Sequence, residues 1–387
     1  MRRVYLDHAA TTPVRPEVVE VMKEHMLEVY GNPSSIHSFG REARKALDGA
    51  REQVASLIGA TPEEIVFTGG GTEADNLAIK GIAEAYAGKG NHIITSAIEH
   101  HAVLHTCEYL EKHGHKVTYL PVDSDGMVDP DDVRKAITPE TVLISIMMGN
   151  NEVGAIQPVK EIGAIARERG VFFHTDAVQA TGQIPVNVVD MNIDLLSGSG
   201  HKMYGPKGIG IVYIRKGIRV SPVLHGGAHE RKRRAGTENV PGIVGLGKAA
   251  ELTMKELPER QEHLARLRDR LIDGIMERIP DVKLNGHRTK RLPNNCNVSI
   301  KYIEGESMLL NLDMHGIAAS SGSACTSGSL EPLHVLLAMG VPHEIAHGSL
   351  RMTFGKQNSA EDVDYVLEVL PSIVKKLREM SPLYARR

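Results

Sequence analysis

The sequence of 387 residues has no tryptophan, only 5 phenylalanines and only 3 cysteines. Cys107, Cys296 and Cys325 are too few and too scattered for a disulfide framework or a four-thiolate zinc site, and an odd number favours a reducing compartment. No apolar run reaches the roughly 18 residues of a membrane span. The N-terminal segment lacks the apolar core of a secretory signal. We therefore expect a cytoplasmic protein that makes no membrane contact.

An excess of charge of one sign is also missing. Lysine and arginine number 45 against 48 aspartates and glutamates, which gives a net charge of −3. No overall electrostatic attraction to nucleic acid or to an anionic membrane follows from this balance, so we expect neither as a direct partner. Glycine, in contrast, is abundant at 38 residues. A glycine-rich, aromatic-poor chain favours an α/β enzyme with many tight turns over a β-sandwich.

The first 250 residues alternate short β-branched runs with segments of helical length, including helices expected over 72–87 and 101–113. This alternation indicates βαβ units and a mainly parallel sheet flanked by helices. The expected strands cover residues 64–68, 92–95, 116–120, 142–147, 171–175, 195–197 and 209–214.

The pattern changes near residue 257. Apolar residues recur with helical period over 260–279. A short strand (297–300) and two helices (308–314 and 360–380) follow. This mixture predicts a smaller α+β domain. We place the boundary within 255–265, so that residues 14–258 form the large domain and residues 1–13 and 259–387 the small one.

The segment SGSGHKMYGPKGIG (197–210) places Lys202 among small residues. Glycine and serine let a lysine approach a bound group closely. If its pKa is lowered, the amine becomes a nucleophile that can form a Schiff base. A solvated loop lysine is the alternative, and these residues alone favour it. Lys207 is a local rival, although its Gly-Pro neighbours indicate a turn.

Asp176 follows the apolar run 171–173, at the strand end where open α/β sheets bind ligands. A carboxylate there can pair with the protonated pyridine nitrogen of pyridoxal phosphate. The alternative is an N-cap of the next helix, which this residue alone favours. Upstream, TGGGTE (68–73) joins a strand to a helix, and such a helix N-terminus binds anions. It matches neither a Walker A loop nor GxGxxG, so a phosphate on a non-nucleotide group fits better. An ordinary glycine turn remains the alternative.

Two further segments carry reactive side chains. His101 and His105 have the i,i+4 spacing of metal ligands, but without HExxH or a third ligand a metal site is disfavoured. His100, at a strand-to-helix turn, could instead stack on a flat cofactor. Cys325 lies in ASSGSACTSGS, whose small polar residues predict a mobile loop. An exposed thiol there suits a group carrier and an incidental surface cysteine equally.

In this order, the motifs resemble the pyridoxal-phosphate-dependent cysteine desulfurases of the NifS/IscS type. The resemblance implies a fold-type-I transferase: a large domain with a mainly parallel seven-stranded sheet flanked by helices, plus a smaller α+β C-terminal domain. The loop SSGSACTSGS points to this branch rather than to SufS-type desulfurases and selenocysteine lyases. The matching segments are YLDHAATTP (5–13), GNPSSIHSFG (31–40), TGGGTEADN (68–76), EHHAVL (99–104), NNEVGAIQP (150–158), HTDAVQ (174–179), SGHKMYGPKGIG (199–210), RAGTEN (234–239), SSGSACTSGSLEP (320–332) and LRMTFG (350–355).

The resemblance implies a role for each matching residue around the cofactor. Lys202 would carry pyridoxal phosphate and move the substrate Cα proton, while Asp176 would pair with the pyridine nitrogen. Gln179 would donate to the phenolic oxygen, and His100 would stack on the ring as a catalytic residue and candidate proton shuttle. The phosphate cup would consist of the Gly71 backbone, Thr72, Ser199 and His201.

Other roles concern substrate, sulfur and assembly. Asn151, also counted among the cofactor contacts, and Arg351 would hold the substrate carboxylate. Thr237 would reach the phosphate from the second subunit, which implies a homodimer with shared sites. Cys325 would take the sulfur of L-cysteine as a persulfide, with L-alanine leaving. It is also expected to ligate a nascent cluster transiently, although no intrinsic metal is implied.

The implied sulfur acceptor is an iron–sulfur scaffold protein, with tRNA thiolation as a further route. One position departs from the family pattern: in GGAHE (226–230), His229 stands where GGxQE has glutamine. Two rival interpretations stay open. A related aminotransferase or kynureninase-like hydrolase would keep Lys202 and Asp176 but have no use for Cys325. A scaffold or regulatory protein would have lost the cofactor, which the presence of both residues argues against.

Overall fold

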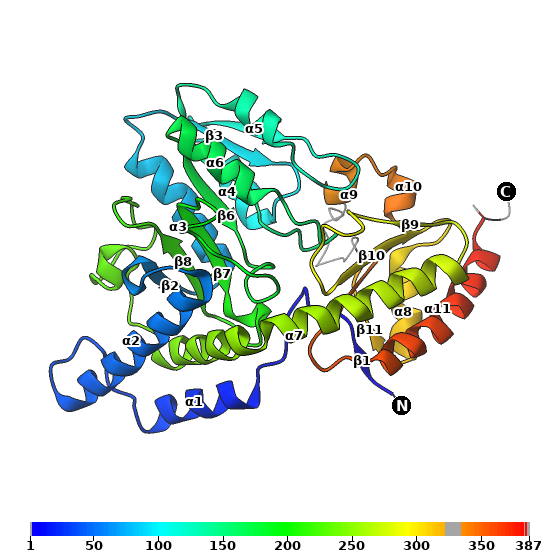
Figure 1. Cartoon of the computed structure of the whole chain (residues 1–387), viewed down its shortest axis with the longest axis horizontal. Coiled ribbons are helices and arrows are strands. Elements are labelled where there is room, and N and C mark those ends of the chain that lie inside the picture. The colour runs from blue at the N-terminus through cyan, green and yellow to red at the C-terminus, as the bar shows by residue number, and fades with distance from the viewer. Residues whose placement is uncertain (1, 322–333, 383, 385–387) are drawn as a thin grey trace.

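The computed structural model describes residues 2–321, 334–382 and 384 (Figure 1). Its main element is a seven-stranded sheet in the order β2-β8-β7-β6-β5-β3-β4. Among these strands, β8 alone runs in the direction opposite to the other six. The expected mainly parallel seven-stranded sheet is therefore confirmed. The strands are β2 (Ile65–Thr68), β3 (His92–Ser96), β4 (Lys116–Leu120), β5 (Thr141–Ser145), β6 (Phe172–Asp176), β7 (Leu195–Ser199) and β8 (Gly210–Ile214).

Helices cover both faces of this sheet. Alternate strand residues point to opposite faces, so Phe67 and Ile94 pack toward one helical layer and Val66 and Ile93 toward the other. Because both faces are covered, every residue of β2, β3, β5, β7 and β8 is buried. The first layer contains α2 (Ser38–Ile58), α5 (Pro130–Ala136), α6 (Val159–Arg169) and the start of α7 (Val240–Arg278); the second contains α3 (Gly71–Ala85) and α4 (His101–Glu111).

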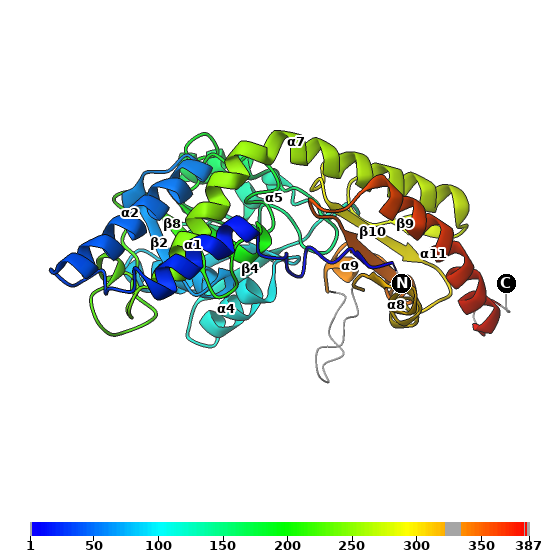
Figure 2. The ribbon, with the colours of Figure 1, turned by 90° about the horizontal axis from the view of Figure 1, so that it is seen from below.

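A second core lies at the other end of the molecule. It joins the N-terminal Val4 and Leu6 to residues of the second half of α7 and of the last helix. Figures 1 and 2 show both chain ends on this side of the molecule. The elements here are β1 (Val4–Tyr5), paired with β11 (Ile317–Ala318); the antiparallel sheet β12-β10-β9, made of Ser349–Thr353, Asn295–Ile300 and Val282–Leu284; and the helices α8 (Gly305–Met314), α9 (His334–Ala338), α10 (His343–Ala346) and α11 (Ala360–Met380).

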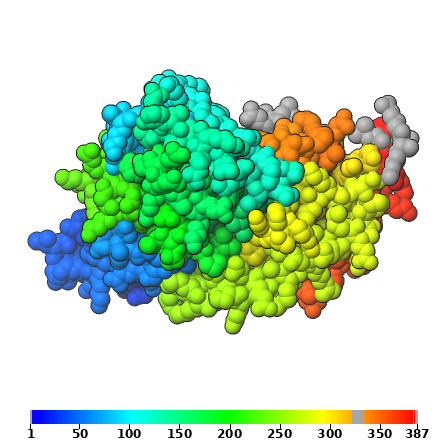
Figure 3. All heavy atoms as spheres, turned by 45° about the horizontal axis from the view of Figure 1, so that its top comes forward, coloured from blue at the N-terminus to red at the C-terminus, as the bar shows by residue number. Residues whose placement is uncertain are grey.

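The long helix α7 connects the two ends. It has 39 residues and includes Pro258, so the boundary placed at 255–265 falls inside a continuous helix. The expected helix 260–279 is its second half. The first half packs on α1 (Pro16–Leu27) and α2, and a Cβ on Gly247 would come within 2.7 Å of the Ala50 Cα. In the space-filling view, the yellow-green atoms of this helix run along the lower side of the molecule, from the blue and green part to the yellow and red part (Figure 3).

None of the helices in the described ranges is both long and apolar enough to cross a membrane.

Candidate active site

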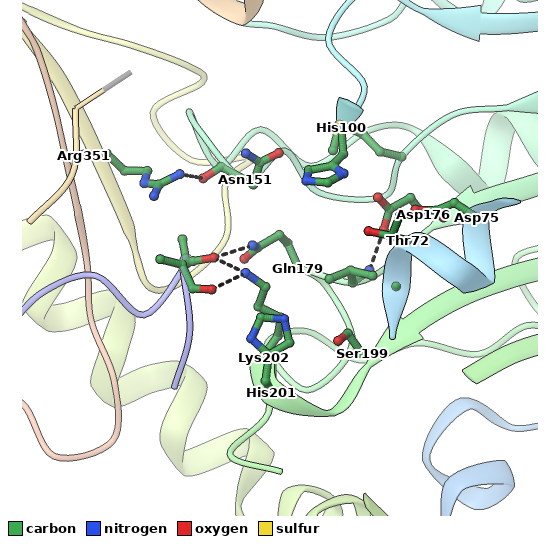
Figure 4. Close-up of a pocket in the computed structure, with 15 residues that line it drawn as sticks. Thr72, Asp75, His100, Asn151, Asp176, Gln179, Ser199, His201, Lys202 and Arg351 are labelled. Atoms are coloured by element: carbon green, nitrogen blue, oxygen red, sulfur yellow. Dashed lines mark hydrogen bonds between the residues drawn. The ribbon is translucent and has the colours of Figure 1, made fainter. Parts of the chain in front are cut away.

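A cavity of about 330 Å³ opens where the parallel strands β3, β5, β6 and β7 end (Figure 4). It brings together residues from the N-terminal segment, the large sheet and β12. Ten of the residues singled out in the sequence line it: Gly71, Thr72, His100, Asn151, Asp176, Gln179, Ser199, His201, Lys202 and Arg351. The remaining lining residues are Ala9, Ala10, Asp75, Met147 and Val178.

Lys202 enters this cavity from a single 3₁₀ turn, η2 (Gly200–Lys202), directly after β7. Its Nζ donates to the carbonyl oxygens of Ala9 and Ala10, the latter at 2.8 Å. Burial, and secondly the charge of Arg351, lower the pKa of Lys202 to about 8. Lys202 is thus not a solvated loop lysine. Its rival Lys207 is exposed and lies outside the lining.

Asp176 is the last residue of β6 and is 5% exposed. Its Oδ1 accepts from the backbone N–H of Val178 at 2.8 Å. Residues 177–194 are all described and contain no helix, so the N-cap interpretation of Asp176 is wrong. Burial raises the pKa of Asp176, while His100 and Lys202 oppose the rise.

Asp75 lies beside Asp176 (Figure 4), and sequence reasoning missed it. It is 1% exposed, on α3, with Oδ1 at 3.7 Å from the His174 Nε2. Burial, and secondly the charge of Asp176, raise the pKa of Asp75 well above its usual range. Glu99 is fully buried nearby, and burial raises its pKa to about 8. Asp75 and Glu99 lie within the family motifs TGGGTEADN and EHHAVL, which was the only sign of them in the sequence. Their burial could not be predicted, because it depends on tertiary packing.

The start of α3 forms one end of the cavity. Gly70 has a φ of 146°, a conformation that favours glycine, and a Cβ on Gly71 would lie 2.7 Å from a Val178 methyl group. The backbone at 70–71 can therefore approach a bound group closely. Thr72, Ser199 and His201 complete this end of the cavity. Burial lowers the pKa of His201 to about 4, so the ring is neutral, and its Nδ1 lies 3.1 Å from the Thr11 Oγ1.

His100 is the N-cap of α4, and its ring faces the cavity (Figure 4). The Nδ1 accepts from the Ala102 N–H at 3.1 Å, which orients the ring. Burial lowers the pKa of His100. Gln179 donates to the Ala9 carbonyl at 2.9 Å, next to the Lys202 amine.

The lining fits pyridoxal phosphate. A helix N-terminus with neighbouring hydroxyls and a neutral histidine suits a phosphate. A buried carboxylate suits a pyridinium nitrogen, and an amine with a lowered pKa suits the bond to the aldehyde.

Arg351 projects from β12 into the opposite side of the cavity. Its Nη1 donates to the Glu152 Oε1 at 2.6 Å, and its Nη2 to the Asp7 Oδ1 at 3.2 Å. Asn151 also donates to the Glu152 Oε1, at 2.8 Å. The Arg351 side chain is 9% exposed. Arg351 and Asn151 are thus brought together, whereas Glu152 was not predicted.

One predicted residue, Thr237, does not line this cavity, and another, Cys325, cannot be placed. Thr237 is exposed, on the segment between η3 (Glu230–Lys232) and α7. Its neighbour Glu238 lies with Oε2 3.0 Å from the Nδ1 of His229. His229 is the residue that departs from the family pattern. Cys325 lies outside the described residues, so its place relative to the cavity stays a prediction.

The other cysteines and the histidine pair offer no rival site. Cys107 and Cys296 are buried, and burial raises the pKa of each thiol to about 12, far from that of a reactive thiolate. The His101 and His105 rings lie 5.0 Å apart. In the part of the chain that the structure describes, no group of three or more ligating side chains could hold a metal.

Comparison with known proteins places the chain in a family. The model of the aminotransferase class-V family matches residues 4–366. A protein of Methanosarcina thermophila named cysteine desulfurase IscS is 63% identical over 382 residues, which cover 99% of this chain and 94% of the relative. A solved NifS-like protein has a TM-score of 0.92 and 42% identity, covering 97% of this chain and all of that chain. A structure described as SspA in complex with cysteine has a TM-score of 0.82 and 39% identity, covering 91% and 98%. The chain therefore belongs to the class-V aminotransferase family and, within it, to the cysteine desulfurases of the NifS/IscS type.

Proposed function

We propose that this protein is a pyridoxal-phosphate-dependent cysteine desulfurase, which converts L-cysteine to L-alanine and leaves the sulfur as a persulfide on Cys325. The observation that carries the proposal is one cavity that holds the Lys202 amine, the buried Asp176 carboxylate and the Arg351 guanidinium. Two titratable groups with shifted pKa values and a carboxylate-binding cation in one cleft indicate amino-acid chemistry. The relatives named cysteine desulfurase support the choice of cysteine.

The residues of the cavity hold the cofactor at its two ends. Asp176 would hold the pyridine nitrogen, and its buried carboxylate would favour the protonated form of that nitrogen. The Gly71 backbone, Thr72, Ser199 and His201 would hold the phosphate, and Gln179 would hold the phenolic oxygen. When bound, pyridoxal phosphate supplies an electron sink for charge that develops at the substrate Cα.

The chain's own groups then move protons and sulfur. Lys202, whose pKa of about 8 suits it to act as a base, would take the Cα proton of the substrate. Arg351 and Asn151 orient the substrate by its carboxylate, and His100 stacks on the ring and shuttles protons. Cys325, as thiolate, attacks the substrate sulfur. One thiol and one cysteine thus give one persulfide and one alanine.

The persulfide passes to an acceptor thiol by exchange. We propose an iron–sulfur scaffold protein as the main acceptor and tRNA thiolation as a secondary route. We infer a cytoplasmic location, because a persulfide carrier requires reduced thiols. We also propose a homodimer in which Thr237 completes the phosphate cup of the other subunit. We further propose that residues 14–258 form the large domain and that residues 1–13 and 259–387 form the small domain.

The experiment supplies L-cysteine and a reductant to the purified holoenzyme and measures sulfide and alanine together. Equal amounts of both products are expected. Lys202→Ala removes the visible absorbance of the bound cofactor and the activity, whereas Lys207→Ala, a matched lysine in the same loop, keeps both. Cofactor absorbance without alanine from cysteine would instead favour a different enzyme of the same fold.

A further inference from the structure

Glu152 occupies the two side chains assigned to the substrate carboxylate. Its Oε1 accepts from the Arg351 Nη1 at 2.6 Å and from the Asn151 Nδ2 at 2.8 Å. A single carboxylate oxygen therefore takes a donor from each of the two residues. The α-carboxylate of a bound amino acid would need the same two donors.

The other two nitrogens of the Arg351 guanidinium do not bind Glu152. The Nη2 lies 3.2 Å from the Asp7 Oδ1, so two different acids share one guanidinium. The Nε is buried and has no hydrogen-bond partner among the described residues. A substrate carboxylate prefers a bidentate grip on two parallel N–H groups. The guanidinium is thus neutralised without having its best carboxylate geometry.

The backbone of Glu152 is held firmly, which leaves its side chain as the movable part. The N–H of Glu152 donates to the Asn150 Oδ1 at 2.9 Å. Its carbonyl oxygen accepts from the side chains of Asn295 at 3.1 Å and Asn297 at 2.9 Å. The side chain is 21% exposed, and its Oε2 finds no hydrogen-bonding group within the described ranges. Among the described residues, rotation of this side chain therefore breaks only its hydrogen bonds to Arg351 and Asn151.

We propose that Glu152 is an internal competitor for the substrate: its carboxylate neutralises Arg351 in the empty site and must be displaced by the α-carboxylate of the incoming amino acid. This inference rests on the proposed function, because it takes Arg351 and Asn151 as the carboxylate-binding pair. Without Glu152, the nearly buried Arg351 would keep only the longer ion pair, with Asp7, in the described part of the chain, and a poorly paired buried cation is unfavourable. Its displacement weakens substrate affinity, so Glu152 sets the KM.

The experiment measures equilibrium binding of L-alanine, the product of the proposed reaction, to the holoenzyme by calorimetry and by the change in cofactor absorbance. Glu152→Gln keeps the size of the side chain but removes its negative charge. The ion pair with Arg351 becomes a bond from a cation to a neutral oxygen, and the bond from Asn151 becomes neutral on both sides, so both are weakened. We expect alanine to bind about tenfold more tightly. Glu152→Ala removes the competitor and should bind alanine at least as tightly as Glu152→Gln does.

Asp7→Asn is the matched control. It removes the same charge from the same guanidinium, but Asp7 takes no side-chain hydrogen bond from Asn151. We expect less than about a threefold change in alanine affinity. Unchanged or weaker binding in Glu152→Gln would overturn the proposal, and so would an equal gain in Asp7→Asn, since a general charge effect would then suffice. Cofactor content and thermal unfolding verify that each variant is folded.

The two levels of the account can fail separately. If the wild-type enzyme forms no alanine from cysteine but Glu152→Gln still binds alanine more tightly, the proposed reaction is wrong and the competitor stands. If desulfuration proceeds and Glu152→Gln leaves alanine binding unchanged, the competitor is wrong and the reaction stands.

Discussion

Lys202 differs from an ordinary lysine through its surroundings. Burial lowers its pKa to about 8, and the charge of Arg351 adds to the effect. A lowered lysine pKa makes the neutral amine dominant above that pH, so incorporation of pyridoxal phosphate into the apoenzyme should rise up to about pH 8 and then level off. The rate of absorbance gain against pH measures this, with N-acetyl-lysine as a control for titration of the cofactor. A rise that continues to the usual lysine pKa would contradict it.

Glu99 predicts a pH dependence of stability. Burial raises its pKa from 4.5 to about 8, so the native state keeps a proton that the unfolded state releases between these values. Stability is therefore lost as pH rises from about 4.5 to 8. Glu99→Gln removes this loss and can still accept from the Ser96 hydroxyl and the Met147 N–H.

At pH 8 the Glu99→Gln apoenzyme should be more stable than the wild type by about 4 kcal/mol, at about 1.4 kcal/mol for each pKa unit between the unfolded and native values. At pH 5 the two should be nearly equal. Chemical denaturation at both pH values measures the difference. A constant difference at the two pH values would show that Glu99 is already ionised in the native state.

The residues that carry covalent and ionic chemistry were predictable because they lie in motifs with telling neighbours. Lys202 stands among glycine and serine, and Asp176 follows an apolar strand. Asp75, Glu99 and Glu152 were missed because their importance comes from burial or from contacts distant in sequence. Glu152 meets Arg351 across 199 positions of chain, and no local pattern announces that pairing.

At the scale of elements, the close approach of α7 to α2 is a packing constraint. A Cβ on Gly247 would meet the Ala50 Cα at 2.7 Å, and backbone cannot move aside as a side chain can. Gly247→Ala should destabilise the protein by about 1–3 kcal/mol through overpacking. Gly49→Ala, inside α2 with no atom near the added methyl group, should be neutral or stabilising by up to about 1 kcal/mol. Urea unfolding of both variants measures the contrast, which equal effects would contradict.

Element type was readable from periodicity, but element extent and direction were not. The strand over 116–120 and the helix over 360–380 match β4 and α11 residue for residue. The helix over 260–279 is only half of α7, because the first half is buried on several sides and shows no single apolar stripe. The sequence did not predict that β8 is antiparallel, because a short, fully buried strand has the same apolar pattern in either direction.

At the scale of the whole molecule, Thr237 tests the proposed dimer. It is exposed and lies outside its own chain's cavity. If it completes the partner's site, Thr237→Ala should lower cofactor affinity about tenfold, the worth of one or two lost hydrogen bonds. A heterodimer of Thr237→Ala with Lys202→Ala would then regain one site of normal affinity, because the site with an intact lysine receives an intact threonine. Dialysis against limiting cofactor measures this. A heterodimer with only weakened sites would place Thr237 in its own chain's site.

The central claim is that sulfur leaves cysteine in the cavity of Lys202 and arrives on Cys325. The direct measurement is a single turnover with L-cysteine held below the enzyme concentration, without reductant, followed by mass analysis of the peptides that contain each cysteine. We expect one alanine released for each sulfur atom gained, with that sulfur on the Cys325 peptide and the Cys107 and Cys296 peptides unchanged. Alanine formed by Cys325→Ala at the wild-type rate, or added sulfur on another cysteine, would contradict it.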